Sequence, residues 1–173
     1  MPVVPNLRPQ SRSLNMATIA REHYDAVFRF CARRVGVERA ADVAQETFLT
    51  AQKALPKYRG ESSLSTWLFG IAHNECRRAC RTARTEPLLL EIEPAHATEA
   101  GSEQTLVDRE ALRVAMAKLS VEHREVVVMH EIEAMTYEEI ADVIGVPVGT
   151  VKSRLHHAFQ NLRKTLLPAE EVR

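Results

Sequence analysis

TYEEIADVIGVPVGTVKSRLHHAFQNLRK, residues 136–164, contains the signals that decide how the C-terminal part of the chain folds. Thr136 and Glu139 have the T-x-x-E spacing of a capping box, in which each side chain bonds the other residue's backbone N–H at a helix start. Gly145 suits the left-handed conformation that ends many helices, and Pro147 suits the start of the next helix. Two helices joined by a short turn that contains glycine predict a helix-turn-helix.

The second of these helices has two different faces. At 100° per residue its apolar side chains gather on one side, which we expect to be buried: Val151, Leu155, Ala158, Leu162 and Leu166. The opposite side has hydrogen-bonding or cationic residues and no carboxylate that would repel phosphate. The residues that we expect to contact DNA from this side, with Arg154 on its flank, are Gly149, Thr150, Lys152, Ser153, Arg154, His156, His157, Gln160, Arg163 and Lys164.

The absence of acidic residues favours a nucleic-acid interface over an ordinary solvated face. No Asp or Glu follows Asp142 until Glu170, whereas solvated helices usually pair both charge signs at i,i+4. A recognition helix directs its N-terminal half at base edges and phosphates, and later cations at the backbone. A helix-turn-helix alone does not say which kind of DNA-binding protein this is.

Charge is segregated along the 173 residues, although 23 Lys and Arg balance 23 Asp and Glu. Residues 1–85 carry 14 basic and 7 acidic side chains, and residues 143–167 carry 4 basic and none acidic. The intervening residues 86–142 carry 14 acidic and 4 basic side chains. Two basic zones separated by an acidic middle are compatible with nucleic-acid binding despite the zero net charge.

Composition indicates a helical protein of the cytoplasm. Gly and aromatic residues are scarce, and good helix formers are abundant. No apolar run approaches the roughly 20 residues that span a bilayer, and residues 1–16 lack the apolar core of a signal peptide. We therefore expect no membrane insertion. Cys31, Cys76 and Cys80 form a sparse, odd set that does not suggest a disulfide framework.

We predict an all-α fold of two small helical domains joined by a flexible acidic linker, because residues 86–105 combine Pro, Gly and five Glu without a basic residue. The expected segments are a disordered tail at 1–16, a domain at 17–85, the linker at 86–105, a domain at 106–168 and a tail at 169–173. Whether translation starts at Met1 or at Met16 stays open.

Local signals place further helix ends. Thr18 is a candidate cap for the first helix, the second runs from about Glu38 to Leu55, and Ser63 or Ser65 can cap the third. Ser120 can cap the helix that follows residues 106–119. In residues 106–119 the side chains expected to point inward are Leu106, Ala111 or Leu112, Ala115 and Leu119.

The N-terminal domain contains two further motifs, DVAQETFLTAQKAL at residues 42–55 and YRGESSLSTWLFGIAHNECRR at residues 58–78. In this order, and followed by the helix-turn-helix, they resemble the extracytoplasmic-function (ECF, group IV) family of RNA polymerase sigma factors. The resemblance covers nearly everything from Thr18 to Leu167. It implies a protein that is not an enzyme, that needs no cofactor or metal, and that directs core RNA polymerase to promoters.

The resemblance also implies partners and sites. The residues 42–55 motif is similar to the helix that binds the β′ clamp of core polymerase, and the β flap is a further expected contact. The matching polar positions are Asp42, Gln45 and Glu46. Asp42, Glu46, Leu49 and Lys53 share a face opposite the apolar one, and we expect Asp42, Gln45, Glu46 and Leu49 to bind core polymerase. A solvated acidic helix start would explain Asp42 alone. The resemblance also implies an anti-sigma factor as a partner, whose identity and signal the sequence does not reveal.

The residues 58–78 motif resembles the segment that captures a flipped base of the minus-10 element. Flipping costs a few kcal/mol, which polar, aromatic and cationic contacts must offset. The expected residues are Arg59, Ser62, Ser63, Ser65, Thr66, Trp67, Asn74, Arg77, Arg78 and Arg81. Trp67 could instead be a core aromatic residue, and each arginine could simply be a solubilising side chain.

The chain departs from the usual sigma-factor pattern at two places. Trp67 is followed by Leu68, where primary sigma factors have two adjacent aromatics for strand separation, so melting should depend more on promoter match. His157 and Phe159 stand where relatives often have arginine. We expect weaker or pH-sensitive minus-35 binding, because histidine titrates near neutrality.

Other classes of function remain open at this point. His73, Cys76 and Cys80 have i, i+3, i+7 spacing and could present soft metal ligands, although no fourth ligand is evident. An enzyme would need a nucleophile with its base or a phosphate loop, and neither is found. The main alternative is a free-standing transcription regulator that binds duplex DNA and ignores polymerase; it would have no use for the two N-terminal motifs.

Overall fold

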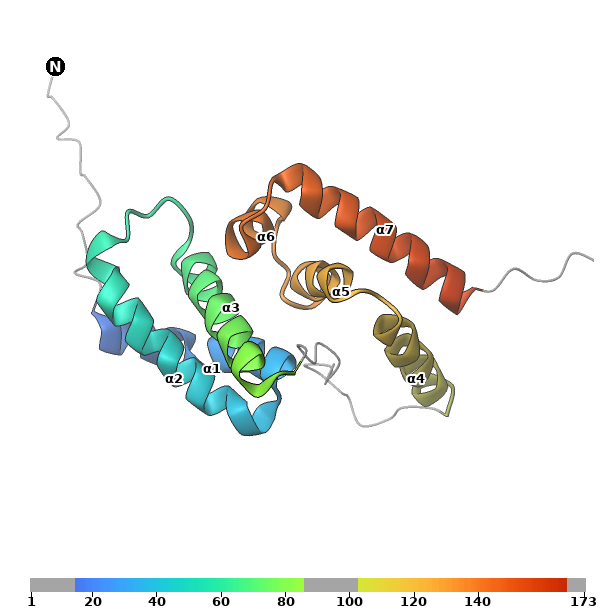
Figure 1. Cartoon of the computed structure of the whole chain (residues 1–173), viewed down its shortest axis with the longest axis horizontal. Helices are drawn as coiled ribbons and strands as arrows, with labels where there is room; N and C mark the ends of the chain where they lie inside the picture. The colour runs from blue at the N-terminus through green and yellow to red at the C-terminus, as the bar shows by residue number, and fades with distance from the viewer. Residues whose placement is uncertain (1–14, 86–102, 168–173) are drawn as a thin grey trace, which may run out of the picture.

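The computed structural model describes residues 15–85 and 103–167, and within these ranges the regular structure is entirely helical, which confirms the all-α class (Figure 1). Residues 1–14 of the predicted N-terminal tail, the predicted C-terminal tail and most of the predicted linker lie outside the described residues, whereas Asn15 and Met16 form the start of α1. The helices form two bundles. The first contains α1 (Met16–Val35), α2 (Val37–Ala54) and α3 (Leu64–Ala83), and the second contains α4 (Glu103–Ala117), α5 (Val121–Val127), α6 (Tyr137–Ile144) and α7 (Val148–Leu166).

Local caps explain where the helices of the first bundle begin. The predicted cap Thr18 is wrong: the carboxamide oxygen of Asn15 accepts the Ala17 N–H at 2.9 Å, so α1 starts earlier. Asparagine is at least as good an N-cap as threonine, and it comes first along the chain. Ser63, one of two candidates, caps α3 by accepting the Thr66 N–H at 3.1 Å.

The core of the first bundle is formed by the inward faces of its three helices. Phe30 and Cys31 of α1 lie against the apolar face of α3, where Leu68, Ala72 and Cys76 are buried. Phe30 stacks on Phe69 with ring centroids 4.9 Å apart. This packing leaves the opposite faces of α2 and α3 available at the surface.

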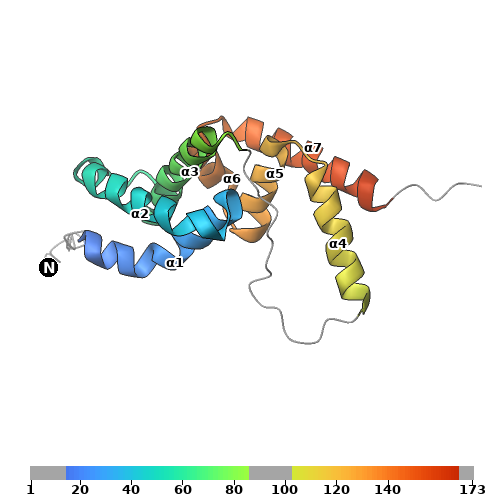
Figure 2. The same cartoon turned by 60° about the horizontal axis from the view of Figure 1, so that its bottom comes forward.

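Helix α4 packs less than the sequence predicts. Its C-terminal end is buried at Ala115 and Met116, but Ala111 and Leu112 are exposed, so the prediction that one of them points inward is wrong. The reason is geometric: α4 projects away from the rest of the molecule, and only its last turn reaches the core (Figure 2). The side chain of Leu106 lies outside the described residues.

Arg124 of α5 connects the C-terminal end of α4 to the rest of the second bundle through hydrogen bonds. Its guanidinium is buried and donates hydrogen bonds to three carbonyl oxygens at the end of that helix, those of Met116, Ala117 and Leu119. Such bonds satisfy carbonyls that have no partner within the helix. After α5 the chain makes one π-helical turn, η2 (Val128–Ile132), before α6.

The helix-turn-helix prediction is confirmed by α6 and α7. Both bonds of the capping box are present: the Thr136 hydroxyl accepts the Glu139 N–H at 3.2 Å, and the Glu139 carboxylate accepts the Thr136 N–H at 3.0 Å. Gly145 ends α6 with φ of 70°, which is the left-handed conformation. Pro147 then precedes the first residue of α7.

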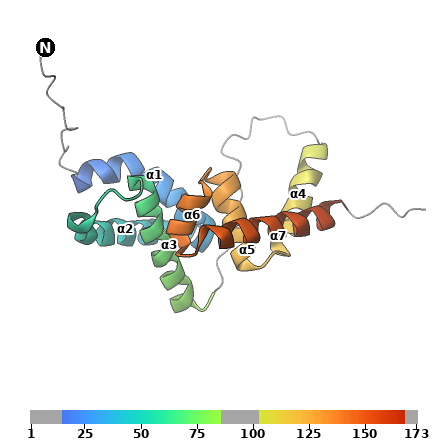
Figure 3. The ribbon, with the colours of Figure 1, turned by 90° about the horizontal axis from the view of Figure 1, so that it is seen from above.

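The two bundles lie side by side through α3 and α6, as the view from above shows most clearly (Figure 3). The ends of α1 and α3 approach α5, η2 and α6, whereas α4 and the end of α7 lie on the far side of the second bundle. None of the described helices is both long enough and apolar enough to cross a membrane.

Candidate nucleic-acid and polymerase interfaces

The polar face of α7 is exposed over its whole length. Leu155 and Leu162 lie buried beneath it, as predicted, whereas Leu166 is 39% exposed because the helix extends past the core at that end. Of the expected DNA contacts, Thr150 and Arg154 are half-buried. The fully exposed ones are Gly149, Lys152, Ser153, His156, His157, Gln160, Arg163 and Lys164.

Side chains on this face are partly ordered by one another. His156 Nε2 and Gln160 Nε2 lie 2.9 Å apart, one helical turn from each other. The Lys152 ammonium lies 5.8 Å from the centre of the Tyr137 ring of α6, a cation–π distance. The face therefore presents cations and hydrogen-bonding groups that fit a phosphate backbone and base edges.

A surface hollow lies between the α2–α3 connection and the start of α3. Its lining residues are Lys57, Tyr58, Arg59, Glu61, Ser62 and Trp67. The Tyr58 and Trp67 rings are 4.9 Å apart, and the Tyr58 hydroxyl donates to the Ser62 carbonyl at 2.7 Å. Two adjacent aromatic rings, tilted by 42° to each other, beside an arginine provide the groups that bind an unstacked base.

Sequence reasoning found Arg59, Ser62 and Trp67 but missed Tyr58 and Lys57 as part of this hollow. Tyr58 stands directly before Arg59 in the motif at residues 58–78, so its position in the sequence could have indicated that it belongs to the same site. Its ring completes an aromatic pair that a single tryptophan cannot provide.

Three residues of the predicted minus-10 set, at the start of α3, contact other groups instead of lining the hollow. Ser63 caps α3, and Ser65 Oγ lies 3.5 Å from His23 Nδ1 of α1. The Thr66 side chain is buried, and its hydroxyl donates to Glu139 Oε1 of α6 at 2.9 Å. In this arrangement Thr66 faces the second bundle.

The remaining predicted minus-10 residues line the exposed side of α3. Asn74, Arg77 and Arg81 are exposed. Arg78 is exposed too, but it leans towards α2, where its guanidinium lies 3.4 Å from Glu75 and 4.0 Å from Glu46. These cations form a stripe along the C-terminal half of α3.

The predicted polymerase-binding residues share the exposed face of α2. Asp42, Gln45 and Glu46 are exposed, and Leu49 is 42% exposed although it is a large apolar residue. A groove runs beside them between α2 and α3, lined by Arg39, Asp42, Val43, Glu46, Glu75, Arg78, Ala79, Thr82 and Ala83. The opposite face of α2, with Ala44 and Phe48, is buried as predicted.

The candidate metal ligands of α3 contact other protein groups. His73 Nδ1 lies 3.0 Å from Glu125 Oε1, and the Cys80 thiol donates to the Arg34 carbonyl at 3.9 Å. A hydrogen bond with Cys31, together with burial, raises the pKa of Cys76 and keeps its thiol protonated. Among the described residues, no three His, Cys, Asp or Glu side chains gather as metal ligands would.

Comparison with known proteins identifies the two bundles. The family models for Sigma-70 region 2 and Sigma-70 region 4 match residues 19–86 and 109–162. RNA polymerase sigma factor YlaC of Bacillus subtilis (strain 168) is 35% identical over 159 residues, which cover 87% of this chain and 91% of that protein. The chain belongs to the extracytoplasmic-function family of RNA polymerase sigma factors. ECF RNA polymerase sigma factor SigL of Mycobacterium tuberculosis (strain ATCC 25618 / H37Rv) is 32% identical to this sigma factor, with 87% and 88% of the two chains covered.

Solved structures share the fold of this sigma factor. The sigma factor RpoE from Bartonella quintana, in complex with the anti-sigma factor NepR, has a TM-score of 0.64 at 23% identity, with 89% of this chain and 98% of that chain covered. CnrH, in complex with the cytosolic domain of CnrY, has a TM-score of 0.61 at 23% identity, with 87% and 86% covered.

Proposed function

We propose that this sigma factor binds core RNA polymerase and directs transcription initiation at promoters with paired minus-10 and minus-35 elements. The observation that carries the proposal is the match to both sigma regions, with the acid-free face of α7 on the second bundle and the aromatic hollow on the first. The sigma factor supplies recognition, and the polymerase performs the chemistry. Its place of action is then the cytoplasm.

In this proposal the exposed face of α2 contacts the β′ clamp of polymerase, and the second bundle contacts the β flap. Leu49, 42% exposed between polar neighbours, is the apolar anchor of the α2 surface. The hollow at Tyr58 and Trp67 receives an unstacked minus-10 base, and the arginine stripe of α3 follows the phosphates. The exposed face of α7 enters the major groove of the minus-35 element.

Reconstitution with core enzyme tests this function. Purified protein would be added to core RNA polymerase and a genomic template, and transcript 5′ ends would be mapped. We expect a limited set of start sites that share two upstream sequence elements. Absence of both specific starts and stable association with core would overturn the proposal and favour a free-standing DNA-binding regulator.

Charge-reversal variants separate the assigned roles. Asp42→Arg should weaken association with core polymerase, because it places a cation on the polymerase-binding face. Lys152→Glu with Arg154→Glu should abolish use of the minus-35 element while core binding persists, because Lys152 is exposed on the polar face of α7 and Arg154 is half-buried on the flank of that face. Loss of core binding in the α7 variant would contradict the assignment.

Regulation by an anti-sigma factor is a further part of the proposal. The two structural relatives described above were solved in complexes, one of them with a protein named as an anti-sigma factor. An inhibitory partner would have to cover the α2 face or the α7 face. Protection of these faces from amide exchange in the purified complex would support this, and an inhibitor that leaves both faces unprotected would exclude it.

A further inference from the structure

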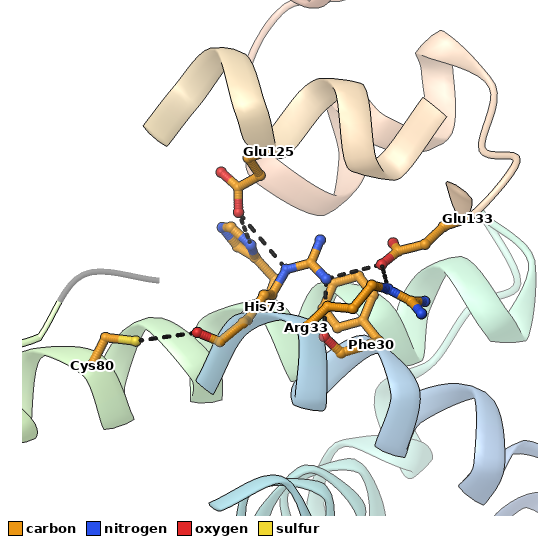
Figure 4. A network of polar contacts seen from close by, with 7 residues as sticks. Phe30, Arg33, His73, Cys80, Glu125 and Glu133 are labelled. Carbon is orange, nitrogen blue, oxygen red and sulfur yellow. Dashed lines mark hydrogen bonds and ion pairs between the residues drawn. The ribbon is translucent and has the colours of Figure 1, made fainter. Parts of the chain in front are cut away.

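The contact between the two bundles is built around a buried arginine. Arg34, at the C-terminal end of α1, is 1% exposed, and its Nη1 donates to Glu133 Oε1 at 3.0 Å. Arg33 Nε donates to the same oxygen at 3.3 Å. Figure 4 shows Glu133 reaching from the second bundle towards Arg33. One carboxylate of the second bundle thus holds two arginines of the first.

Two further contacts cross the same boundary. Glu125 Oε1 lies 3.0 Å from His73 Nδ1 and 4.0 Å from Arg34 Nε (Figure 4). Nearer the start of α3, the Thr66 hydroxyl donates to Glu139 at 2.9 Å. The boundary is therefore joined at three places on the second bundle, in α5, at the end of η2 and in α6.

Several buried polar atoms of Arg34 and Glu133 lack a hydrogen-bond partner in the described part of the chain. Arg34 Nε and Nη2 and the second oxygen of Glu133 are buried and have no hydrogen-bond partner. The Arg34 guanidinium also lies over the Phe30 ring at 3.4 Å, a contact within its own helix that does not depend on the second bundle. Separation of the bundles would return the unpaired groups to water and offset part of the lost attraction. Such a contact can hold the bundles together and still be released.

The closed arrangement conflicts with simultaneous use of both promoter elements. The names of the elements place them about 25 base pairs apart, which is roughly 80 Å of duplex at 3.4 Å per base pair. Thr66, next to the aromatic hollow, touches α6, and α7 follows α6 directly. A 19-residue helix spans about 28 Å. Two surfaces only a helix length apart cannot reach both elements together.

We propose that Arg33, Arg34 and His73 of the first bundle, with Glu125 and Glu133 of the second, form an interbundle latch that keeps the free protein closed and unable to span a promoter. Binding to core polymerase, which separates the bundles, opens the latch and frees Thr66. The consequence for promoter use rests on the proposed function. The closed state of the free protein does not.

The test removes the two latch carboxylates without removing contacts inside the second bundle. In the described residues, the side-chain hydrogen bonds and ion pairs of Glu125 and Glu133 go to the first bundle. The variant Glu125→Gln with Glu133→Gln is compared with Glu110→Gln with Glu131→Gln. The control changes charge equally, but its carboxylates pair with Arg113 and His130 of the second bundle.

Small-angle scattering and amide exchange are measured on the free, full-length proteins, and circular dichroism monitors helix content. We expect the latch variant to have a larger radius of gyration, and the starts of α3 and α6 to exchange about tenfold faster or more. The control should match the wild type. If the latch variant has the same radius of gyration and the same exchange rates as the wild type, the proposal is wrong. It is also wrong if the free wild type is already as extended as a protein with separated bundles.

Two further measurements separate a failure of the latch proposal from a loss of folding and from a failure of the proposed function. If the double variant lost helix content, Glu133→Gln alone would be measured by scattering and amide exchange, because within the described residues the hydrogen bonds and ion pairs of that carboxylate go to Arg33 and Arg34. Transcription with core polymerase is assayed separately. A compact wild type opened by the variant, without any promoter activity, would support the latch and reject the proposed function.

Discussion

Lys152, which is exposed on the polar face of α7, provides a direct test of how this helix contacts DNA. Its ammonium lies near Tyr137 and has no carboxylate partner on its own helix. If it contacts one phosphate, Lys152→Ala should lower the slope of log affinity against log salt by about 0.9 and weaken binding similarly at all promoters. The measurement is promoter binding by the reconstituted holoenzyme between low and moderate salt. Lys118→Ala, at an exposed position just after α4, is the control; an unchanged slope would place Lys152 away from the phosphates.

The ring of Tyr58, rather than its hydroxyl, should bind the minus-10 base. Tyr58→Ala removes half of the aromatic pair with Trp67, and stacking is worth about 1–3 kcal/mol per base, so binding of a single-stranded minus-10 oligonucleotide by the holoenzyme should fall about 5- to 150-fold. Tyr58→Phe keeps the ring and loses only the bond to the Ser62 carbonyl. Its affinity should stay close to wild type. Equal losses in both variants would assign the effect to the loop and not to stacking.

At the scale of an element, the turn between α6 and α7 requires a left-handed backbone conformation at Gly145. Gly145 has φ of 70°, and a Cβ added there would meet no atom within 4 Å. Gly145→Ala should therefore destabilise the protein by about 1–2 kcal/mol through backbone strain only. Gly149→Ala, where a Cβ also finds open space within a helix, should stabilise by up to about 1 kcal/mol. Denaturant unfolding measures the free energy of unfolding of both variants. A similar loss of stability in both would show that steric contact of the added Cβ, and not the φ angle, determines the effect.

Elements whose signals are local could be predicted from the sequence. The capping box at Thr136, the Gly145 turn and the two faces of α7 depend on neighbouring residues, and the structure has each of them. The inward face of α4 was predicted wrongly because Leu112 has a suitable helical position but is 38% exposed to solvent within the described residues, and tertiary packing decides burial. Tyr58 was overlooked because a loop residue has no periodicity to reveal its neighbour.

At the scale of the whole molecule, the contact between the bundles could not be predicted from periodicity. Arg34 lies on the same buried side of α1 as Phe30 and Val27, but nothing in the sequence identifies its partners. Glu125 and Glu133 stand 91 and 99 positions away from it, in segments whose charge pattern resembles solvated helix. The candidate sites were predictable because each is formed within one or two elements, whereas the latch joins groups that only the complete fold brings together.

Acid should open the closed form through Glu125. Burial alone would raise the pKa of Glu125, but His73, Arg34 and Arg77 outweigh burial and hold it below the ordinary value of 4.5. When the bundles separate, the carboxyl regains that ordinary value. A carboxyl whose pKa is lowered in the closed form stabilises that form above pH 4.5, and the contribution is lost as the pH falls through the lower, closed-form pKa.

The radius of gyration of the wild type should accordingly stay constant from neutral pH to about pH 4.5 and rise below it. Glu125→Gln resembles the protonated carboxyl, so this variant should be more open at neutral pH, and its difference from the wild type should shrink as the pH falls. Scattering on both proteins, with helix content recorded at each pH, measures this. Glu110→Gln, which removes an exposed carboxylate paired within α4, should follow the wild type throughout. A difference between wild type and Glu125→Gln that persists well below pH 4.5 would mean that the ionised carboxylate does not hold the bundles together.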